Sequence, residues 1–361
     1  MQRLSFLLIT LLIAIPLISA QAVDEYELFM ILGEYIEPDE PGMVVYVFDN
    51  GTEASAAYGL ANLDTGETLS TDDVFRIAST TKPMVATIVL WLVDSGDIEL
   101  DAPIADYLSS EMISNIPNAE STTVRQMLQM TSGIFDYTES DVFDDAVQDN
   151  PSYGWTAAEV LTFAYDEEPY FAAGDGYYYS NTNYILAELV IEAVSGMSLD
   201  NALNSIIFEP LSMDSCFLET PSRFTEALVQ GYELDDDNEY VNITRQNDGV
   251  GMGDGGVICN VADLAKFPIA LWNGDLISEA LLNEMLTTVD DGEGGQYGLG
   301  IGYDDTEFGM ILSHDGASSG FQSDMLYLPD DGIVVTILTN NFDSDVVEDV
   351  KYDVLDAVFG G

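Results

Sequence analysis

One stretch of the sequence decides the fold, and it runs Phe75-Arg76-Ile77-Ala78-Ser79-Thr80-Thr81-Lys82-Pro83-Met84-Val85-Ala86-Thr87-Ile88-Val89-Leu90-Trp91-Leu92-Val93. The part from Pro83 to Val93 is apolar on every side, which predicts a buried helix that ends at Asp94-Ser95-Gly96. Pro83 fits the first turn of such a helix, where a missing N–H costs little. Ser79 is therefore expected at the N-terminus of a core helix, beside free backbone N–H groups and the positive end of the helix dipole.

The lysine three residues after Ser79 gives this helix start a chemical role. Lys82 lies one turn on and faces the same side of the helix as Ser79. Partial burial would lower the pKa of the lysine and let it accept the serine proton. The alternative is an ordinary helix start with a solvated lysine, because a Ser-x-x-Lys match alone is weak evidence. The pairing predicts a serine nucleophile with a lysine base.

The charge balance makes each remaining cation more informative. The chain has 65 Asp and Glu residues against 8 Lys and Arg residues, a formal net charge of −57. So few cations cannot form a basic patch, which excludes nucleic acid and anionic membranes as natural partners. Disorder is not the explanation, since 47% of the residues are hydrophobic. Self-repulsion of this size favours a saline medium that screens it. The competing interpretation is an acidic medium that neutralises carboxylates.

A second cluster, Tyr177-Tyr178-Tyr179-Ser180-Asn181, leads into an apolar run at helical spacing that ends at Gly196. Either Asn181 or Thr182 can cap that helix, which is the structural explanation of both residues. The chemical explanation is that Tyr179 offers a phenol near a proton path, while Asn181 offers an amide that grips a substrate carbonyl.

The third cluster holds the only histidine of the chain, in Ser313-His314-Asp315-Gly316. Strand-like segments flank it, Gly309–Leu312 on one side and Gln322–Leu328 on the other. A glycine on a strand suggests the close approach of another backbone, and for Gly316 a substrate backbone is one candidate. His314, beside such a glycine, is a candidate site residue.

In this order and spacing, Ser79-x-x-Lys82, Tyr179-x-Asn181 and His314-Asp315-Gly316 resemble the three motifs of the serine β-lactamase and penicillin-binding protein superfamily. The Tyr-x-Asn form resembles the branch that holds class C β-lactamases, D-alanyl-D-alanine carboxypeptidases, D-aminopeptidases and related esterases. Further similar stretches include Gly255-Gly256-Val257 and Tyr297-Gly298-Leu299-Gly300. The resemblance covers nearly the whole mature chain.

The resemblance implies an α+β fold of the β-lactamase/transpeptidase type, with an antiparallel sheet flanked by helices and a second, mostly helical domain. The sheet domain is expected from residues 23–107 and 240–361, and the helical domain from residues 108–239. A hairpin at Met43–Tyr58 and a terminal helix at Asp345–Phe359 fit the sheet domain. The site would lie in the cleft between the two parts.

The same resemblance implies a role for each candidate side chain. Ser79 would attack the substrate carbonyl and form an acyl-enzyme, while Lys82 and Tyr179 share the proton transfers. Asn181 would bind the acyl portion of the substrate. His314 would hydrogen-bond or polarise Tyr179 and its neighbours, in place of the lysine that the family has there.

The resemblance also implies an oxyanion hole built from backbone. The N–H groups of Ser79 and Ala317, the latter next to Gly316, would bind the developing oxyanion. We expect no cofactor and no metal. The acidic run Asp235–Asp237 lacks a calcium-loop glycine, and no Cys-His cluster suggests zinc.

The implied activity is that of a secreted serine hydrolase, a D-alanyl-D-alanine carboxypeptidase-like peptidase or esterase that acts on a small-molecule or peptide acyl substrate. Class C β-lactamases have Lys-Thr-Gly where this chain has His314-Asp315-Gly316, which speaks against an efficient β-lactamase. A β-lactamase remains the alternative, and a non-catalytic acyl-binding sensor protein is the third hypothesis.

Asp315 bears on the substrate's charge. Relatives that handle penicillins or free peptide C-termini place a hydroxyl at this position to receive a carboxylate. A carboxylate about 4 Å from a substrate carboxylate would cost on the order of 4 kcal/mol at an effective dielectric near 20. We therefore expect neutral substrates to be preferred over anionic ones.

The pattern of residues 1–22 predicts a secretory signal, with Arg3, an apolar run from Leu4 to Leu17 and a cleavage site at Ala20-Gln21-Ala22. An uncleaved N-terminal anchor is the alternative. The signal implies a secreted protein, extracellular or periplasmic, with no stable membrane insertion after its removal.

The two cysteines of the chain, Cys216 and Cys259, permit one disulfide in a secreted protein. Two buried free thiols explain them equally well, and the sequence leaves the choice open.

Overall fold

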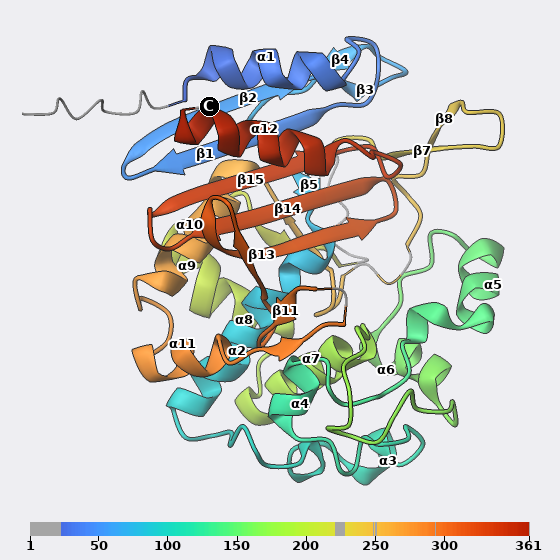
Figure 1. Ribbon diagram of the computed structural model, residues 1–361. Helices are drawn as coiled ribbons and strands as arrows, with labels where there is room; N and C mark the ends of the chain where they lie inside the picture. The colour runs from blue at the N-terminus through green and yellow to red at the C-terminus, as the bar shows by residue number, and fades with distance from the viewer. Residues whose placement is uncertain (1–22, 221–227, 248, 250, 293, 361) are drawn as a thin grey trace, which may run out of the picture.

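The computed structural model of the protein describes residues 23–220, 228–247, 249, 251–292 and 294–360 (Figure 1). The expected signal segment, residues 1–22, lies outside these ranges, and its prediction stays untested. Among the residues that are described, no helix is both long and apolar enough to cross a membrane.

A large antiparallel sheet forms the upper part of the molecule in Figure 1. Its eight strands follow the order β10-β11-β12-β13-β14-β15-β1-β2. Their bounds are β1 Met43–Asp49, β2 Thr52–Tyr58, β10 Val289–Asp290, β11 Gln296–Tyr297, β12 Gly302–Thr306, β13 Gly309–Ser318, β14 Phe321–Leu328 and β15 Ile333–Thr339. The α+β fold with a β-lactamase/transpeptidase-like antiparallel sheet, predicted from the sequence, is confirmed.

The predicted hairpin is the pair β1 and β2, joined by a two-residue turn. Asn50 and Gly51 both have positive φ, 47° and 95°, as a turn that matches the twist of its strands requires. Met43 pairs with Tyr58 on one side and with Thr339 of β15 on the other. The first strand of the chain therefore lies beside its last strand.

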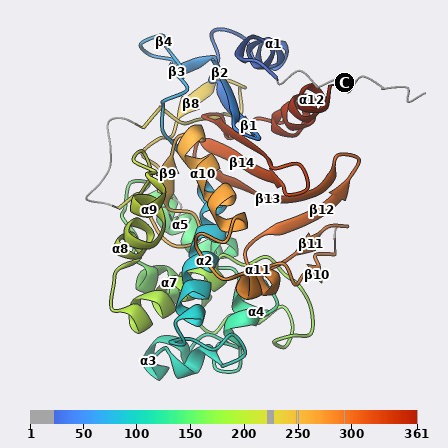
Figure 2. The same cartoon turned by 90° about the vertical axis from the view of Figure 1, so that its left-hand side faces the viewer.

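Helices cover both faces of this sheet, which is why β1 and β15 are almost continuously apolar. On the outer face, α1 (Glu25–Tyr35) and α12 (Val347–Phe359) lie side by side in Figures 1 and 2. Leu32, Val45 and Val354 belong to the apolar cluster that they bury. On the inner face, α10 (Val261–Trp272) packs against the sheet and leads to the helical part.

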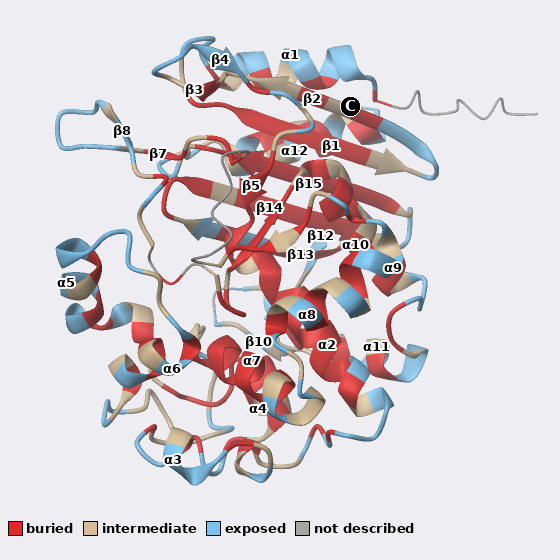
Figure 3. Ribbon diagram, turned by 180° about the vertical axis from the view of Figure 1, so that it is seen from behind, coloured by how far each residue is buried: buried red, intermediate tan, exposed pale blue. Residues whose placement is uncertain are grey.

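Two helices form the centre of the helical part. The predicted core helix is α2 (Lys82–Asp94), and the helix after the tyrosine run is α7 (Thr182–Ser195). They pack against each other, and both are red for burial in Figure 3. The shorter helices around them are α3 Ser110–Ile113, α4 Val124–Leu128, α5 Asp141–Asp149, α6 Ala157–Val160, α8 Leu199–Leu203, α9 Glu209–Leu211 and α11 Glu279–Met285.

Small sheets complete the described part of the fold. One of them, in the order β5-β9-β6, leads the chain directly into the Ser79 segment, because β5 ends at Arg76. The bounds of the short strands are β3 Leu60–Asn62, β4 Glu67–Thr68, β5 Phe75–Arg76, β6 Phe217–Leu218, β7 Tyr232–Leu234, β8 Tyr240–Asn242 and β9 Val257–Cys259. A disulfide joins Cys216 to Cys259 next to this sheet, which settles the alternative that the sequence left open.

Most of the described cations hold carboxylates in ion pairs. These pairs are Arg76 with Glu219, Arg125 with Asp101 and Glu284, Lys266 with Asp263, and Lys351 with Asp324. Arg76 and Glu219 are both buried, and the pair lies just before the Ser79 segment. Lys82 differs from this group, because its amino group contacts a serine, an amide and a backbone carbonyl.

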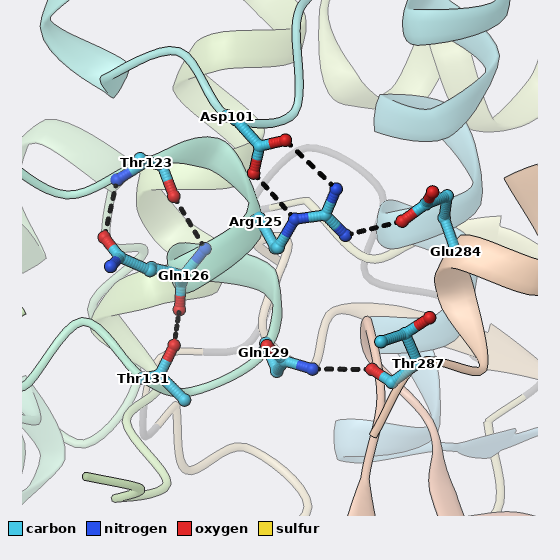
Figure 4. A network of polar contacts seen from close by, with 8 residues as sticks. All are labelled: Asp101, Thr123, Arg125, Gln126, Gln129, Thr131, Glu284 and Thr287. Carbon is cyan, nitrogen blue, oxygen red and sulfur yellow. Dashed lines mark hydrogen bonds and ion pairs between the residues drawn. The ribbon is translucent and has the colours of Figure 1, made fainter. Parts of the chain in front are cut away.

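Figure 4 shows how Arg125 and Gln129 link α4 to α11 and to the segment before β10. Its guanidinium donates to Asp101 Oδ1 and to Glu284 Oε2, each at 2.8 Å. Gln129 Nε2 donates to the carbonyl of Thr287 at 2.6 Å, just before β10 begins. These contacts join α4 to α11 and to the residue pair that leads into β10.

Candidate functional site

The predicted nucleophile lies on a tight turn that precedes α2. Residues Ala78–Thr81 form one turn of 3-10 helix, and the α-helix begins at Lys82. Ala78 has a φ of 45°, in the left-handed region that a residue with a side chain adopts only under constraint. Ser79 is half-buried at the start of this turn, where backbone N–H groups have no partner within the helix.

Strands β13 and β14 hold this turn in place. The Thr80 hydroxyl donates to the carbonyl of His314 at 3.1 Å and lies 2.7 Å from the Ser323 hydroxyl. The Ser323 hydroxyl in turn donates to the carbonyl of Ile77 at 2.7 Å. The serine is therefore fixed against the third motif by buried hydrogen bonds.

Gly316 allows this close packing. A Cβ atom at Gly316 would lie 2.6 Å from the Ile77 carbonyl oxygen and 2.7 Å from the Ser79 nitrogen, far inside van der Waals contact. The backbone that approaches Gly316 most closely is thus the chain's own, which accounts for the glycine without a substrate. Gly316 also lines the larger cavity, and its role in binding substrate stays a prediction. Gly316 acts on the site by letting β13 lie against the Ser79 turn.

Lys82 donates three hydrogen bonds from a fully buried side chain. Its Nζ atom lies 2.9 Å from Ser79 Oγ, 2.8 Å from Asn181 Oδ1 and 2.6 Å from the carbonyl oxygen of Asp254. Burial lowers the pKa of Lys82 from 10.5 to about 8, although nearby carboxylates oppose the shift. A substantial fraction of neutral lysine is then present near pH 8, in contact with the serine hydroxyl, as a general base requires.

Asn181 does not cap α7 with its side chain. Its backbone is already helical, and the side chain makes no capping hydrogen bond. Instead Oδ1 accepts from Lys82, while Nδ2 donates to Asp136 Oδ2 at 3.1 Å and to Thr138 Oγ1 at 3.3 Å. The structural explanation of Asn181 is therefore wrong. A substrate carbonyl that binds this amide has to share Nδ2 with those two acceptors.

Tyr179 lies over the amino group of Lys82, whose Nζ atom is 4.9 Å from the centre of the ring. Burial raises the pKa of Tyr179 well above 10, and its hydrogen bond with Ser79 offsets only part of that shift. The phenol is thus protonated in the resting site. Of the two residues expected to share the proton transfers, Lys82 has the pKa of a base and Tyr179 that of a donor.

His314 is buried and bonded at both ring nitrogens. Nδ1 lies 2.6 Å from the carbonyl oxygen of Asp315, which can only accept, so Nδ1 carries the hydrogen. Burial lowers the pKa of His314 to about 4, so the ring is neutral and Nε2 accepts from the Tyr297 hydroxyl at 3.0 Å. The observed partner of Nε2 is Tyr297 and not the expected Tyr179, whose ring centre lies 6.3 Å from that of His314.

Three further residues of the site did not come from motif reasoning. Tyr297 lies in a stretch noted only for its family resemblance, and Asp136 and Asp254 were not singled out at all. Asp136 orients Asn181, and the carbonyl of Asp254 orients Lys82. Asp254 directly precedes Gly255-Gly256, and an acidic side chain beside a paired glycine turn was the available signal.

Two cavities meet at Ser79 and share Asn181 and Ala317 in their walls. The smaller cavity, of about 320 Å³, is also lined by Tyr137, Phe143, Asp254, Ser318 and Phe342, among others. The larger cavity, of about 650 Å³, is also lined by Asp136, Glu139, Tyr179, Asp291, His314 and Asp315, among others. The larger cavity therefore has four carboxylates in its wall and suits neutral or cationic groups.

Among the described strands, none but β14 pairs with β13 where the cavities meet. Strand β12 pairs with β13 only as far as Ser313, so the pairing recorded for His314–Ser318 is with β14 alone. Ala317, three residues after His314, is exposed on this segment and lines both cavities together with Ser79. The predicted oxyanion donors, Ser79 and Ala317, thus line the same space. In the ranges that the structure describes, no group of three or more His, Cys, Asp or Glu residues could hold a metal ion.

Comparison with known proteins places this site in a family. Residues 31–358 match the family model described as Beta-lactamase. Penicillin-binding protein 4* of Bacillus subtilis strain 168 is 27% identical over 325 residues, which cover 82% of this chain and 66% of that protein. Penicillin-binding protein 4 of Amycolatopsis lactamdurans is 27% identical over 317 residues, or 83% of this chain and 81% of that protein.

A solved structure shows the same architecture. The D-stereospecific amidohydrolase from Streptomyces sp. superposes with a TM-score of 0.81 at 27% identity, covering 93% of this chain and 99% of that one. The likeness therefore extends over both the sheet and the helical part.

Proposed function

The chain belongs to the beta-lactamase family of serine hydrolases, and from that premise we propose that it hydrolyses amide or ester bonds of small acyl substrates through an acyl-enzyme on Ser79. One observation carries the proposal. The amino group of a fully buried lysine with a lowered pKa lies 2.9 Å from the Ser79 hydroxyl. That is the contact a serine needs to become a nucleophile.

Acylation would begin with neutral Lys82, which takes the proton of Ser79 as its oxygen attacks the substrate carbonyl. The oxyanion that develops would be bound by the N–H groups of Ser79 and Ala317, a contribution of roughly 3–4 kcal/mol per donor in other serine hydrolases. The leaving group then needs a proton. Tyr179 has the high pKa of a donor and borders only the larger cavity.

This placement assigns a direction to the substrate. The leaving group would depart through the larger cavity, where Tyr179 can protonate it and take a proton from Lys82 in turn. The acyl group would stay in the smaller cavity, beside Asn181. In deacylation, water enters from the side that the leaving group vacated and gives a proton to neutral Lys82, directly or through Tyr179, as its oxygen attacks the acyl carbonyl. The bond to Ser79 then breaks, Lys82 returns that proton to the Ser79 oxygen, and the acid product leaves.

Several observations favour a peptidase, amidase or esterase of the carboxypeptidase type over a β-lactamase. His314 is neutral at the position where class C β-lactamases have a lysine. The larger cavity has carboxylates in its wall, whereas Lys82 is buried and occupied by three acceptors. Neither feature attracts the carboxylate of a penicillin or cephalosporin. One of the similar proteins is named as a D-stereospecific amidohydrolase, in keeping with an amide substrate.

The test is covalent labelling followed by turnover. A fluorophosphonate probe should label Ser79, as mass spectrometry of the digested protein would show, and Ser79→Ala should lose both the label and the hydrolysis of nitrophenyl acetate. Ser180→Ala, a buried serine one residue from Tyr179, is the matched control and should still be labelled at Ser79. A label elsewhere in active protein would contradict the assignment. Labelling without turnover of esters, amides or β-lactams would favour the acyl-binding sensor.

The location of the protein is a second part of the proposal. Secretion into a saline medium accounts together for the signal-like residues 1–22 and the net charge of −57. Mass spectrometry of the protein recovered from the culture medium should show an N-terminus near Val23. Recovery of the full-length chain from the membrane fraction would instead support the uncleaved anchor.

A further inference from the structure

Asp254 has a carboxylate oxygen for which the fold provides no partner. Asp254 is 6% exposed, and its Oδ1 atom is buried without a hydrogen bond among the residues that the structure describes. The other oxygen, Oδ2, accepts from the Tyr137 hydroxyl at 2.7 Å. An unpaired buried acceptor is costly, and more so when it carries charge, so it calls for an explanation.

The residue is held firmly on both sides. Its carbonyl accepts from Lys82 at 2.6 Å, and the N–H of Gly253 donates to Glu188 Oε2 on α7 at 2.8 Å. The backbone of Asp254 is therefore held by the same turn that positions Lys82, and its carboxylate is held by Tyr137. The amino group of Lys82 contacts the carbonyl of Asp254 and not its carboxylate. The carboxylate therefore has no role in the proposed proton transfers.

A second unpaired group lies in the wall of the same cavity. The Ser318 hydroxyl is buried, has no hydrogen-bond partner among the described residues and, like Asp254, lines the smaller cavity next to Ser79. One group is an anionic acceptor, and the other is a hydroxyl that can accept or donate. Two unmet acceptors in the wall of one cavity match a ligand that has several donors.

We propose that Asp254 and Ser318 bind a primary ammonium group on the acyl portion of the substrate. This inference rests on the proposed acyl-enzyme function and names its substrate class: amides or esters of amino acids or peptides with a free amino group near the scissile carbonyl. An ammonium supplies three donors and a charge that the carboxylate compensates. Tyr137, Phe143 and Phe342 in the same wall leave room for an apolar side chain beside it.

The experiment compares acyl groups on a constant leaving group. The p-nitroanilides of D- and L-alanine carry the ammonium, N-acetylalanine p-nitroanilide blocks it, and propionyl p-nitroanilide lacks it. For the preferred enantiomer, kcat/KM of the alanine compound should exceed that of the propionyl compound at least about tenfold. A hydrogen bond to a charged group supports a difference of that order.

The variants are judged by the ratio of the two kcat/KM values, so that a general loss of activity cancels. Asp254→Asn keeps the acceptor for Tyr137 but removes the charge, and should lower the alanine-to-propionyl ratio about 10- to 100-fold, mainly through the KM of the alanine compound. Ser318→Ala should lower it several-fold. Asp144→Asn removes an exposed carboxylate from the rim of the same cavity and, as the matched control, should change the ratio less than about twofold.

The outcomes separate this inference from the proposed function. If Ser79 takes the fluorophosphonate label and the propionyl compound turns over, but the wild-type ratio is one or less, the inference fails alone. It also fails if Asp254→Asn slows both substrates equally, since that result marks a merely structural residue. If Ser79 is not labelled and none of the substrates turns over, the proposed function itself fails.

Discussion

The Nε2 atom of His314 lies 3.0 Å from the hydroxyl of Tyr297, and this contact fixes the state of the only histidine in the chain. Because Nδ1 faces the carbonyl of Asp315, the ring is the tautomer with its hydrogen on Nδ1. The third motif therefore offers the site a neutral ring and a tyrosine, where the related lysine-bearing motif offers a cation.

The tautomer leads to a direct spectroscopic prediction. With a pKa of about 4, lowered by burial, His314 should show no titration between pH 5.5 and 8. Selective 15N-histidine labelling of protein without a histidine tag gives signals from one residue only. We expect a protonated Nδ1 and an unprotonated Nε2 across this range, and Tyr297→Phe should shift the Nε2 resonance. A titration midpoint near 6.5 would contradict the buried, neutral assignment.

The lowered pKa of Lys82 sets the pH dependence of acylation. Because the neutral amine is the base, kcat/KM for nitrophenyl acetate should rise with pH and level off above about 8. Asn181→Asp would place a carboxylate where an amide oxygen now lies 2.8 Å from Nζ. It should stabilise the ammonium form of Lys82 and move the midpoint of the pH profile of kcat/KM upward by about one pH unit or more. At pH 7 the reaction should be slower by about tenfold or more.

Asn181→Ala provides the control for that shift, since it removes the acceptor and adds no charge. In this variant the midpoint of the pH profile should stay where it is or move downward, while kcat/KM also falls. If both variants kept the wild-type midpoint, another group would be responsible for the pH dependence.

Glu188 gives a prediction for stability. Burial raises its pKa from 4.5 to about 8, and no cation lies among the causes of the shift. Between pH 4.5 and 8 the folded protein therefore holds a proton on Glu188 that the unfolded chain releases. The free energy of unfolding falls as the pH rises through that window. Glu188→Gln mimics the protonated acid and should be more stable than wild type by about 2–5 kcal/mol at pH 8.5, but not at pH 4.5.

Urea unfolding at the two pH values, in high salt, measures this difference. Glu192→Gln removes a carboxylate one turn further along the same helix and controls for the loss of charge on α7. A Glu188→Gln variant that is equally destabilised at both pH values would show that hydrogen bonding to Gly253, rather than protonation, determines the effect.

Salt should stabilise the fold. A net charge of −57 opposes compaction, and the Debye length falls from about 10 Å at 0.1 M to about 3 Å at 1 M salt. We expect Tm at pH 7.5 to rise steadily as NaCl goes from 0.1 to 3 M. Sorbitol at equal osmolality controls for solute exclusion and should raise Tm less. A flat or falling curve, with a higher Tm at pH 4.5, would favour the acidic medium instead.

The outcome of the sequence analysis follows from how local each signal is. The core helix, the hairpin and the strands around His314 depend on the periodicity of neighbouring residues, and they lie where that pattern predicts. The partner of Gly316 depends on how two distant segments pack, which periodicity does not contain. Asp254 lies 172 positions from Lys82, so only the fold reveals their contact.

The charge of the substrate should affect its turnover. The structure lowers the expected repulsion between Asp315 and a substrate carboxylate. Side chains alternate along β13, so exposed Asp315 lies on the opposite face from buried His314 and Gly316, yet it lines the larger cavity. Because water reaches this exposed carboxylate and screens it, the cost to a bound carboxylate is expected to be smaller than about 4 kcal/mol. The field of Asp315 reaches the site, because its carboxylate partly offsets the lowering of the Lys82 pKa that burial causes.

At a separation of about 8 Å and an effective dielectric of about 40–80, the repulsion is about 0.5–1 kcal/mol per carboxylate. Four carboxylates line the larger cavity, so nitrophenyl acetate should still have a higher kcat/KM than a D-Ala-D-Ala peptide or a chromogenic cephalosporin. Asp315→Thr should improve the two anionic substrates only about two- to fivefold, and less in 3 M NaCl than in 0.1 M. Neutral nitrophenyl acetate, whose rate should barely change, is the internal control. Were the anionic substrates to be preferred by wild type and unaffected by Asp315→Thr, the acidic wall of the larger cavity would not govern substrate choice.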